Sequence, residues 1–440
     1  MTPAARLAAA IELLEAIGRA GPPIEPVIDG FVRSRRYMGA KDRRAVTGRA
    51  FAVLRALRRL DWHLARAGRD TPTARRRALA GLLLTEALSP ADAAALFSGE
   101  GHAPAPLDAE ETALAEALAG RSLDDPAMPG PVRLEYPDWL DGPLGRAFGP
   151  RLAAEMAALN APAPLDLRVN TLKATPEAAR QALSAEGVES EPTPLSPIGL
   201  RVAGRAALPT TRAFRDGLIE VQDEGSQIVA LLAGARPGMT VIDFCAGAGG
   251  KTLALAAAMG EAGRPMGTLW ALDVEGRFLK RLTERAARAG AAAIRTHALE
   301  GEADPWLAAH AGLADLALVD APCSGSGVWR RHPAARAWLT PERLADLMAR
   351  QCQALEAAAG LVRPGGRLVY ATCSLLMEEN EDRVGDFLAA HPDFQMVAVA
   401  DAWATALAAP CPATGPTLRL SPATTGTDGF FAAILERARK

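Results

Sequence analysis

Two cysteines stand in short motifs that suit nucleophilic chemistry. Cys323 lies in Asp320-Ala-Pro-Cys-Ser-Gly-Ser-Gly, and Cys373 lies in Tyr370-Ala-Thr-Cys-Ser. A cysteine thiolate is a strong nucleophile when its surroundings lower the pKa of the thiol. A single cysteine is more often a small buried apolar side chain. Because both cysteines lie just past predicted strands, we expect them to face one shared crevice, which favours a reactive role.

A glycine-rich loop forms the second candidate site. The segment Asp243-Phe-Cys-Ala-Gly-Ala-Gly-Gly-Lys-Thr252 separates a predicted strand from a predicted helix. Glycines allow a ligand to approach the backbone, and the helix start offers free N–H groups. A phosphate-binding P-loop needs a glycine where Cys245 stands, and a dinucleotide fingerprint needs one where Thr252 stands. Both patterns fail. The third interpretation is a methyltransferase loop, in which an acidic residue ends the first strand and glycines cradle the methionine part of S-adenosylmethionine.

An acidic residue also ends the next predicted strand. Asp273 follows residues 268–272, one strand after the glycine loop. An acid at this place in a strand–helix–strand unit binds ribose hydroxyls. The competing interpretation is a helix N-cap, which is a common role for aspartate. Together with the glycine loop, the position favours contact with a ribose.

The elements that must position these residues alternate between strands and helices from about residue 212 onward. This pattern predicts a parallel sheet covered on both faces, with ligands beyond the carboxyl ends of its strands. Predicted strands cover residues 240–244, 268–272, 316–319, 367–371 and 430–435. Predicted helices cover residues 252–259, 276–289 and 341–359.

The first half of the chain has a different character. Residues 4–120 show helical spacing of apolar residues throughout, with one long amphipathic helix predicted over 43–64. Residues 121–163 are rich in proline and glycine and are interpreted as a connector. A small α+β module is predicted over 164–207, with strands at 165–172 and 199–202 and a helix at 176–186.

The charge distribution points to a nucleic acid. The whole chain carries a net charge of −2, yet residues 1–80 hold 17 basic against 7 acidic residues. A basic region on an acidic body favours contact with RNA or DNA. The competing interpretation is a coding bias toward arginine, because 44 of the 49 basic residues are Arg.

Several protein classes are disfavoured by what the sequence lacks. The five cysteines, at 245, 323, 352, 373 and 411, include no Cys-x-x-Cys pair, and the six histidines form no ligand cluster. We therefore expect neither a disulfide framework nor a metal site. No uncharged apolar run reaches 18 residues, and the first residues lack the features of a secretory signal. A cytoplasmic protein without a membrane span is expected.

The motifs resemble those of the RsmB-type, or Sun-type, RNA cytosine-5 methyltransferases over nearly the whole chain. The likeness is strongest in residues 243–252, 320–339 and 370–381, and residues 426–431 resemble the closing strand of the family. The resemblance implies that Cys373, in the Thr-Cys motif, is the nucleophile. It also implies that Cys323, in the Pro-Cys motif, assists release of the product. In DNA cytosine-5 methyltransferases the Pro-Cys cysteine is the nucleophile instead.

The implied reaction explains the need for these residue types. Carbon 5 of cytosine accepts a methyl group only after a thiolate has added to carbon 6. A base must then remove the C5 proton so that the thiolate can leave. Groups near the N3 and N4 edge of the base stabilise the adduct, and Asp320 and Lys251 are placed for this role. The target base must be unstacked or single-stranded.

The resemblance also assigns the cofactor contacts. The family residues that bind S-adenosylmethionine correspond to Cys245, Ala246, Gly247, Ala248, Gly249, Gly250, Lys251, Asp273 and Asp320. For the adenine amino group, Glu300 is the best candidate, and Leu299 is equally close by spacing. Two departures stand out: Gly247-Ala248 replaces the Ala-Pro of the usual loop, and Met377 stands at a usual proline.

The resemblance finally predicts a fold and a partner. We expect a multidomain protein with an all-α, NusB-like RNA-binding domain at 1–125 and a connector with a small RNA-recognition-like α+β module at 126–211. A Rossmann-like class I methyltransferase domain is expected at 212–440. We expect the protein to be a monomer. Its predicted partner is RNA, and small-subunit rRNA is favoured. A tRNA substrate, or a non-catalytic role in ribosome assembly, is the alternative.

Overall fold

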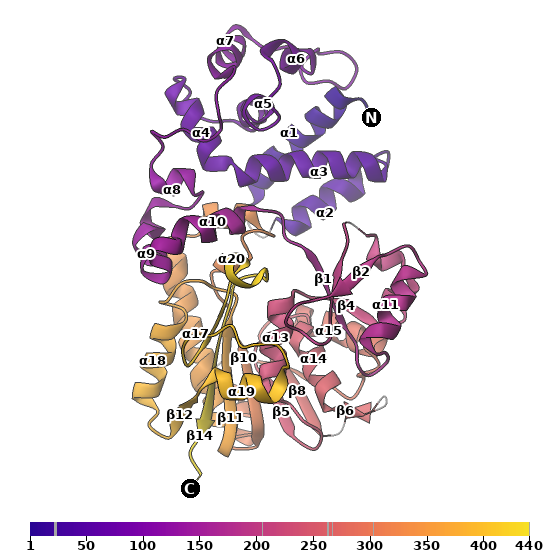
Figure 1. Ribbon diagram of the computed structural model, residues 1–440, viewed down its shortest axis with the longest axis vertical. Helices are drawn as coiled ribbons and strands as arrows, with labels where there is room; N and C mark the ends of the chain where they lie inside the picture. Colours follow the sequence, from indigo (N-terminus) through magenta and orange to yellow (C-terminus); the bar gives the residue numbers. More distant parts are fainter. Residues whose placement is uncertain (22–23, 205, 262–263, 266, 302, 440) are drawn as a thin grey trace. The chain divides into compact units, whose positions relative to one another are not determined.

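The computed structural model describes residues 1–439 except 22, 23, 205, 262, 263, 266 and 302. The chain divides into two compact units. The first, which we call the helical unit, comprises Met1–Ala161 and Trp329–Thr340, and the second, the sheet unit, comprises Pro162–Val328 and Pro341–Lys440 (Figure 1). The division into three domains proposed from the sequence stays a prediction.

The helical unit confirms the all-helical interpretation of the N-terminal region. Its core is formed by apolar side chains of α1, α3, α4, α5 and α7. The helices are α1 Pro3–Ala20, α2 Glu25–Ser34, α3 Ala40–Arg55, α4 Leu57–Arg66, α5 Ala74–Leu84, α6 Pro90–Ala95, α7 Ala109–Leu118, α8 Gly130–Arg133, α9 Asp141–Phe148 and α10 Leu152–Asn160. Three 3-10 turns complete it: η1 Asp138–Leu140, η2 Gly149–Arg151 and η5 Pro333–Trp338.

The prediction of a single helix over residues 43–64 is wrong, because this segment forms two helices, α3 and α4. Ala56 lies between them with φ −112° and ψ 17°. The buried carboxylate of Glu135 accepts hydrogen bonds from the backbone N–H groups of Arg58, at 3.0 Å, and Arg59, at 3.2 Å. These are donors of the first turn of α4 that a continuous helix would have bonded internally. A distant residue therefore stabilises a helix start that local periodicity does not indicate. The predicted connector 121–163 likewise contains α8, α9 and α10.

The sheet unit begins with the small α+β module. Its four strands pair antiparallel in the order β2-β3-β1-β4. The elements are β1 Leu165–Val169, α11 Pro176–Ser184, β2 Ser190–Pro192, β3 Gly199–Val202, η3 Leu208–Thr210, α12 Arg212–Arg215 and β4 Ile219–Val221. The apolar and polar alternation of β1 was correctly predicted. Its polar side chains are nevertheless buried, and Arg168 donates to the carbonyl oxygen of Gly250 at 3.0 Å. The polar face of β1 therefore packs on the part of this unit that contains the glycine loop.

The large sheet has the order β12-β14-β11-β10-β5-β8-β9, with β13 pairing β14 (Figure 1). The central strands β11, β10, β5, β8 and β9 run parallel, and β14 is antiparallel to β11. The strands are β5 Thr240–Asp243, β8 Thr268–Asp273, β9 Arg295–Ala298, β10 Ala314–Asp320, β11 Val362–Thr372, β12 Phe394–Val397, β13 Leu418–Leu420 and β14 Phe430–Arg437. Two-residue strands β6 Gly260–Glu261 and β7 Arg264–Pro265 form a separate pair.

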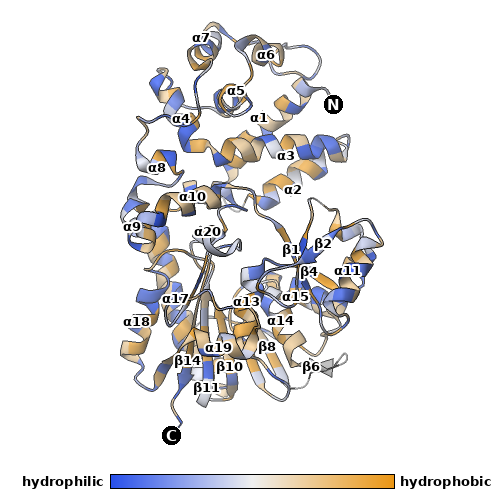
Figure 2. Ribbon diagram, viewed as in Figure 1, coloured by the Kyte–Doolittle hydropathy of each residue, from blue (hydrophilic) through white to orange (hydrophobic). Residues whose placement is uncertain are grey.

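Helices cover both faces of this sheet, as the sequence predicted. Neighbouring residues of one strand face opposite ways, so Val241 belongs to one apolar cluster and Ile242 to the other. Hydrophobic residues run through β5, β8 and α13 (Figure 2). The helical elements are α13 Glu224–Ala233, α14 Gly250–Met259, α15 Gly276–Ala289, α16 Pro305–Ala309, η4 Ser326–Val328, α17 Pro341–Leu361, α18 Glu381–Ala390, α19 Val399–Ala406 and α20 Pro422–Thr425. Among the described residues, no helix is long and apolar enough to cross a bilayer.

Candidate active site

The ends of the parallel strands bring the predicted acidic residues to one edge of the sheet. Asp243 ends β5, Asp273 ends β8 and Asp320 ends β10. In the register of β10 and β5, Leu318 lies opposite Asp243, so Asp320 extends two residues farther. Asp320 in turn lies opposite Ala371 of β11, two residues before Cys373. Adjacent parallel strands therefore place the glycine loop and both cysteine motifs at the same edge.

The glycine loop takes a shape that depends on two glycines. Gly247 has φ +53° and Gly249 has φ +85°, values in the left-handed region that favours glycine. A Cβ atom on Gly249 would lie 2.6 Å from Cγ of Leu282, because α15 packs directly against the loop. Arg285 of α15 also donates to the carbonyl oxygen of Ala248 at 2.6 Å. Contacts with α15 thus fix the loop, while Gly247 and Ala248 remain partly exposed.

Asp273 lies against this loop. Its Oδ2 accepts a hydrogen bond from the backbone N–H of Gly247 at 2.8 Å, and its Oδ1 accepts one from Glu275 at 2.8 Å. Each carboxylate oxygen can accept further hydrogen bonds. The next residue, Val274, has a 68% exposed side chain, so an apolar surface adjoins the carboxylate. Sequence reasoning missed Val274, although an exposed aliphatic residue beside an acid suits a nucleoside.

Asp243 differs from the other two strand-end acids because its side chain is fully buried. Its Oδ2 accepts a hydrogen bond from the hydroxyl of Thr252 at 2.6 Å, whereas Oδ1 has no partner among the described residues. Burial raises the pKa of Asp243 to about 7, against the opposing effect of the Thr252 hydrogen bond. Asp243 therefore ties β5 to the start of α14 and does not reach a ligand.

Lys251 and Asp320 form an ion pair at the strand edge. The distance from Nζ of Lys251 to Oδ2 of Asp320 is 2.7 Å. The lysine side chain is 7% exposed and the aspartate 33% exposed, so a ligand reaches the pair from the aspartate side. Nζ also lies 5.2 Å from the ring centre of Phe430, where the aromatic face favours a cation. Phe430 lies in the segment 426–431 that resembles the closing strand of the family, but the resemblance assigned it no role at the site.

The two cysteines are in direct contact. Their sulfur atoms lie 3.4 Å apart, and both side chains are free thiols that remain partly exposed. The hydrogen bond to Cys373 and burial together raise the pKa of the Cys323 thiol, and the nearby carboxylate of Glu379 adds to this effect. The geometry favours Cys323 as a proton-bearing partner beside the sulfur of Cys373.

A buried carboxylate, Glu379, holds the two cysteine loops together. Its Oε1 accepts hydrogen bonds from the backbone N–H of Ser324 and from Nε2 of Gln351, both at 2.8 Å. Its Oε2 accepts from the hydroxyls of Ser324, at 2.5 Å, and Ser374. Each serine directly follows one of the two cysteines. Glu379 lies within residues 370–381, where the family resemblance is strong, but no local signal pointed to this function.

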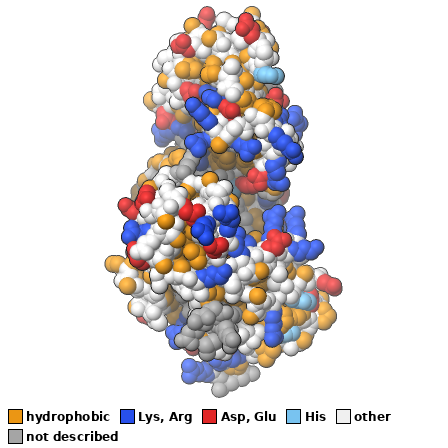
Figure 3. All heavy atoms as spheres, turned by 90° about the vertical axis from the view of Figure 1, so that its right-hand side faces the viewer, with side chains coloured by type: hydrophobic (Ala, Val, Ile, Leu, Met, Phe, Trp, Pro, Cys, Tyr) orange, Lys and Arg blue, Asp and Glu red, His pale blue; other side chains and the backbone are white. Residues whose placement is uncertain are grey.

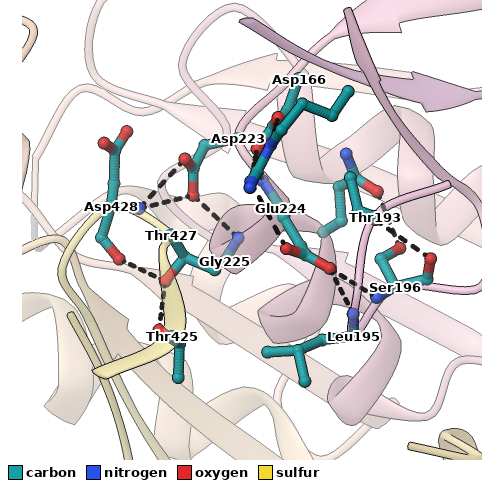
Figure 4. A network of polar contacts seen from close by, with 12 residues as sticks. Asp166, Thr193, Leu195, Ser196, Asp223, Glu224, Gly225, Thr425, Thr427 and Asp428 are labelled. Atoms are coloured by element: carbon teal, nitrogen blue, oxygen red, sulfur yellow. Dashed lines mark hydrogen bonds and ion pairs between the residues drawn. The ribbon is translucent and has the colours of Figure 1, made fainter. Parts of the chain in front are cut away.

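The closing segment of the chain crosses the cysteine loops. Gly327 donates its N–H to the carbonyl oxygen of Cys373 at 2.9 Å and accepts from Gly429 at 2.8 Å. A Cβ atom on Gly327 would collide with the carbonyl oxygen of Gly429. The two carboxylate oxygens of Asp223 accept from the N–H of Asp428 at 3.0 and 3.1 Å (Figure 4). The start of α13 thereby fixes residues 427–430, which carry Phe430 to Lys251.

Three predicted cofactor residues differ in accessibility. Cys245 is half-buried, and burial raises the pKa of its thiol. Leu299 is 7% exposed and packs in the core cluster that also contains Phe244 and Leu272. Glu300 is exposed, and its backbone N–H donates to Asp304 Oδ2 at 2.9 Å. Only Glu300 of the two adenine candidates offers its side chain to solvent. The described residues contain no cluster of three or more potential metal ligands.

Comparison with known proteins gives consistent matches. The family model for 16S rRNA methyltransferase RsmB/F matches residues 230–436, and a model for the ferredoxin-like domain of RsmF/B-like methyltransferases matches residues 136–208. Ribosomal RNA small subunit methyltransferase B of Erwinia tasmaniensis is 30% identical over 439 residues, covering 97% of each chain. A probable enzyme of the same name from Synechocystis is 33% identical over 327 residues, covering 74% of this chain and 72% of the relative. The crystal structure of PH0851 superimposes with a TM-score of 0.78 and 27% identity over 99% of both chains.

Proposed function

Since the chain belongs to the RsmB/F family of methyltransferases, we propose that it methylates carbon 5 of a cytosine in RNA through Cys373. Its general activity is S-adenosylmethionine-dependent methylation of RNA, and its methyltransferase part has the expected Rossmann-like fold. The observation that carries the finer proposal is the 3.4 Å contact between the sulfur atoms of Cys323 and Cys373. Two thiols at a strand edge, beside a cofactor loop, suit addition to a pyrimidine and its reversal.

The glycine loop and Asp273 fit S-adenosylmethionine. The positive φ angles of Gly247 and Gly249 shape the backbone of the loop, and nothing lies within 4 Å of an added Cβ on Gly247. The carboxylate of Asp273, beside Gly247, is the proposed acceptor for ribose hydroxyls. Val274 supplies apolar surface for the adenine ring, and Glu300 is the proposed acceptor for its amino group. When bound, the cofactor supplies an electrophilic methyl group on a sulfonium.

Cys373 is proposed to add as a thiolate to carbon 6 of the cytosine. The new S–C6 bond makes carbon 5 nucleophilic, so that carbon 5 takes up the methyl group. A base then takes the C5 proton, the electron pair of that C–H bond re-forms the C5–C6 double bond, and the C6–S bond breaks to release Cys373 as a thiolate. Cys323 is proposed to assist this last stage, since its sulfur lies next to the departing one.

Asp320 and Lys251 are proposed to stabilise the covalent adduct. The exposed side of the Asp320 carboxylate would face the N3 and N4 edge of the base, while Lys251 fixes its position at 2.7 Å. Lys251 is itself anchored over Phe430, which residues 427–430 bring to the edge. The pair places charge where the adduct forms and needs little rearrangement to do so.

The proposed substrate is small-subunit rRNA in the cytoplasm. This choice rests on the names of the relatives that match nearly the full chain and on the basic helical N-terminal region, for which we retain the NusB-like interpretation. The proposed alternatives are a tRNA substrate and a non-catalytic role in ribosome assembly. The free thiols, the ion pair and the glycine loop favour catalysis.

A methyl-transfer assay tests the proposal. Purified protein and labelled S-adenosylmethionine are incubated with unmodified small-subunit rRNA or tRNA, and the RNA is digested to nucleosides. The expected product is 5-methylcytidine from the rRNA alone. If the label appears in tRNA, tRNA replaces rRNA as the proposed substrate. If it appears in a nucleoside other than 5-methylcytidine, the proposed chemistry is overturned. RNA binding without any label would favour the assembly role.

A further inference from the structure

An exposed basic turn in the helical unit is not used by the site described above. Residues 33–44 link the end of α2 to the start of α3 and contain six basic residues against one acidic residue. We define the α2–α3 patch as Arg36, Tyr37, Lys41, Arg43 and Arg44, which are all exposed. Figure 3 shows Lys and Arg side chains gathered over the lower part of this unit on the face viewed.

The cations of this patch lack acidic partners. Among the described residues, neither Arg36 nor Lys41 has an ion pair or side-chain hydrogen bond, and the same holds for the side chains of Arg43 and Arg44. The acid within the segment, Asp42, is already engaged by Nε of Arg6 at 2.7 Å and by the N-terminal amine at 3.4 Å. Four positive charges therefore face solvent without compensation, which suits a polyanion.

The position of these charges is unfavourable for the fold itself. Lys41, Arg43 and Arg44 lie in the first two turns of α3, and its N-cap Gly39 offers no side-chain cap. A helix N-terminus carries a partial positive charge that favours anions and disfavours cations. A role in folding would predict acidic residues here, whereas binding of phosphates explains the basic ones.

Tyr37 is presented by a fixed turn. Its side chain is 68% exposed, although the residue after it, Met38, is 1% exposed in the core. Arg35 holds the other end of the turn, because its guanidinium lies 3.6 Å from the ring centre of Phe31 and pairs with Glu12 at 2.7 Å. Tyr37 directly follows Arg36, and an exposed aromatic ring beside a cation can stack on an unpaired base.

We propose that the α2–α3 patch is a binding site for single-stranded RNA, in which Tyr37 stacks on a base and the four cations contact phosphates. This inference rests on the proposed function in taking RNA as the substrate. It goes further by assigning a second RNA contact, outside the strand edge that holds the cysteines. The expected ligand is single-stranded, because a base in a duplex does not offer its face to a side chain.

The test compares full-length variants by fluorescence anisotropy with a labelled single strand of about 15 nucleotides, a length near the site sizes of single-strand binders. Tyr37→Ala is expected to weaken binding about tenfold, and Tyr37→Phe or Tyr37→Trp to restore most of the affinity. The combined variant R36Q/K41Q/R43Q/R44Q is expected to reduce the slope of log affinity against log salt by about 3. Ultraviolet crosslinking should place an RNA adduct on Tyr37.

A matched control removes four exposed cations that already pair with acids. These are Arg19, Arg180, Arg350 and Arg363, and the variant R19Q/R180Q/R350Q/R363Q should keep affinity and salt slope near those of the wild type. Thermal unfolding separates binding from folding. Neutralising Lys41, Arg43 and Arg44 should leave the melting temperature unchanged or raise it, because the charges oppose the α3 dipole. A lowered melting temperature together with intact RNA affinity would overturn the proposal.

The outcomes also separate this inference from the proposed function. If wild-type protein methylates RNA and all patch variants bind RNA as it does, the patch proposal fails and the function stands. If the wild-type protein binds RNA without methylating it, and the variant Tyr37→Ala binds RNA more weakly than the wild type, the proposed function fails and the patch proposal stands. Variants that keep RNA affinity but lose binding to a ribosomal protein would reassign the patch to a protein partner and overturn the RNA proposal.

Discussion

The strand edge of the sheet unit has a cofactor side and a cysteine side, and they are built in different ways. The cofactor side, residues 244–251 with Asp273, is shaped by the backbone: two glycines with positive φ and N–H groups bonded to a neighbouring strand end. The cysteine side, residues 320–328 and 370–381, is held by buried side chains around Glu379, which bonds residues 55 and 5 positions away.

This difference predicts what each side tolerates. A loop defined by backbone shape is sensitive to added volume, because a Cβ atom meets α15 or forces strain. A network around a buried carboxylate is sensitive to loss of charge, because its donors lose their acceptor. Changes on the cysteine side should therefore impair transfer and leave cofactor affinity intact, while changes on the cofactor side should lower cofactor affinity first.

The largest expected effect is that of Cys373→Ala. If Cys373 is the nucleophile that we propose, its loss leaves carbon 5 unactivated, and methyl transfer should fall about 10,000-fold or more. The affinity for S-adenosylmethionine, measured by calorimetry, should stay within about twofold of wild type, because Cys373 is on the cysteine side. Cys352→Ala, in the middle of α17, is the control and should retain full activity. Loss of cofactor binding in Cys373→Ala would show that the two sides are not independent.

Cys323→Ala is expected to stop turnover at a later stage. If Cys323 assists release, the enzyme should remain bound to RNA through Cys373, because the adduct forms but does not resolve. A denaturing gel should show a slower band that contains both protein and RNA. The double variant C323A/C373A should abolish this band. Rapid multiple turnover by Cys323→Ala would assign release to another group.

Glu379→Gln tests the network of the cysteine side. A glutamine of the same shape can accept on one end only, so at least two buried donors lose their acceptor. The free energy of unfolding, from urea titration, should fall by about 2 to 4 kcal/mol. Asp386→Asn, at a 72% exposed position of α18, should change it by less than about 0.5 kcal/mol.

A second measurement on Glu379→Gln distinguishes an electrostatic role from a merely structural one. The carboxylate contributes to the raised pKa of the Cys323 thiol, so its removal should lower that pKa. Alkylation of Cys323 by iodoacetamide near pH 8 should then become faster. The rate is compared between the single variant Cys373→Ala and the double variant C373A/E379Q, so that Cys373 does not react in either protein. An unchanged rate would limit Glu379 to holding the loops.

Asp243, which ends β5 just before the cofactor side, gives the stability of the fold a predicted pH dependence. Its pKa is raised from 3.8 to about 7 in the folded protein, chiefly by burial, so the native state holds this proton more tightly than the unfolded state. Its contribution to stability is therefore full below about pH 4 and is lost as the pH rises toward 7. Relative to Asp243→Asn, wild-type protein should lose about 2 to 4 kcal/mol over this range. Parallel curves for the two proteins would contradict the raised pKa.

The sequence predicted the strand edge well because its signals are local. Short apolar runs followed by Asp273 and Asp320 specify strands and their ends, and parallel order then brings those ends together. The pairing of Lys251 with Asp320 at 2.7 Å follows from this arrangement. The helix at 276–289 was predicted to the residue, since its apolar spacing is regular and Gly290 ends it in the left-handed conformation.

What the sequence did not reveal depends on contacts between distant residues. Glu379 looks like any acid before a helix, and its role arises from two serines that lie beside it only in the folded sheet. Glu135 accepts from the backbone N–H of Arg58, 77 residues away, and so stabilises a helix start just after Ala56 that interrupts a regular helical pattern. Arg168 and Asn170 alternate like a solvent-facing side of a strand, yet both are buried against the methyltransferase part. Periodicity alone does not distinguish such an interface from a wet surface.

The smallest effects compare two glycines of the same loop. Gly247→Ala introduces only the strain of φ +53°, because nothing lies within 4 Å of its added Cβ, and should cost about 1 kcal/mol. Gly249→Ala adds a clash with Leu282 to the strain of φ +85° and should cost about 2 to 3 kcal/mol. Calorimetry should show that both variants bind S-adenosylmethionine more weakly than the wild type, and that Gly249→Ala has the lower affinity of the two. Both variants should keep the contact between Cys323 and Cys373. Equal unfolding energies for the two variants would show that α15 yields to the new methyl group, and the cofactor side would then be defined by backbone angle alone.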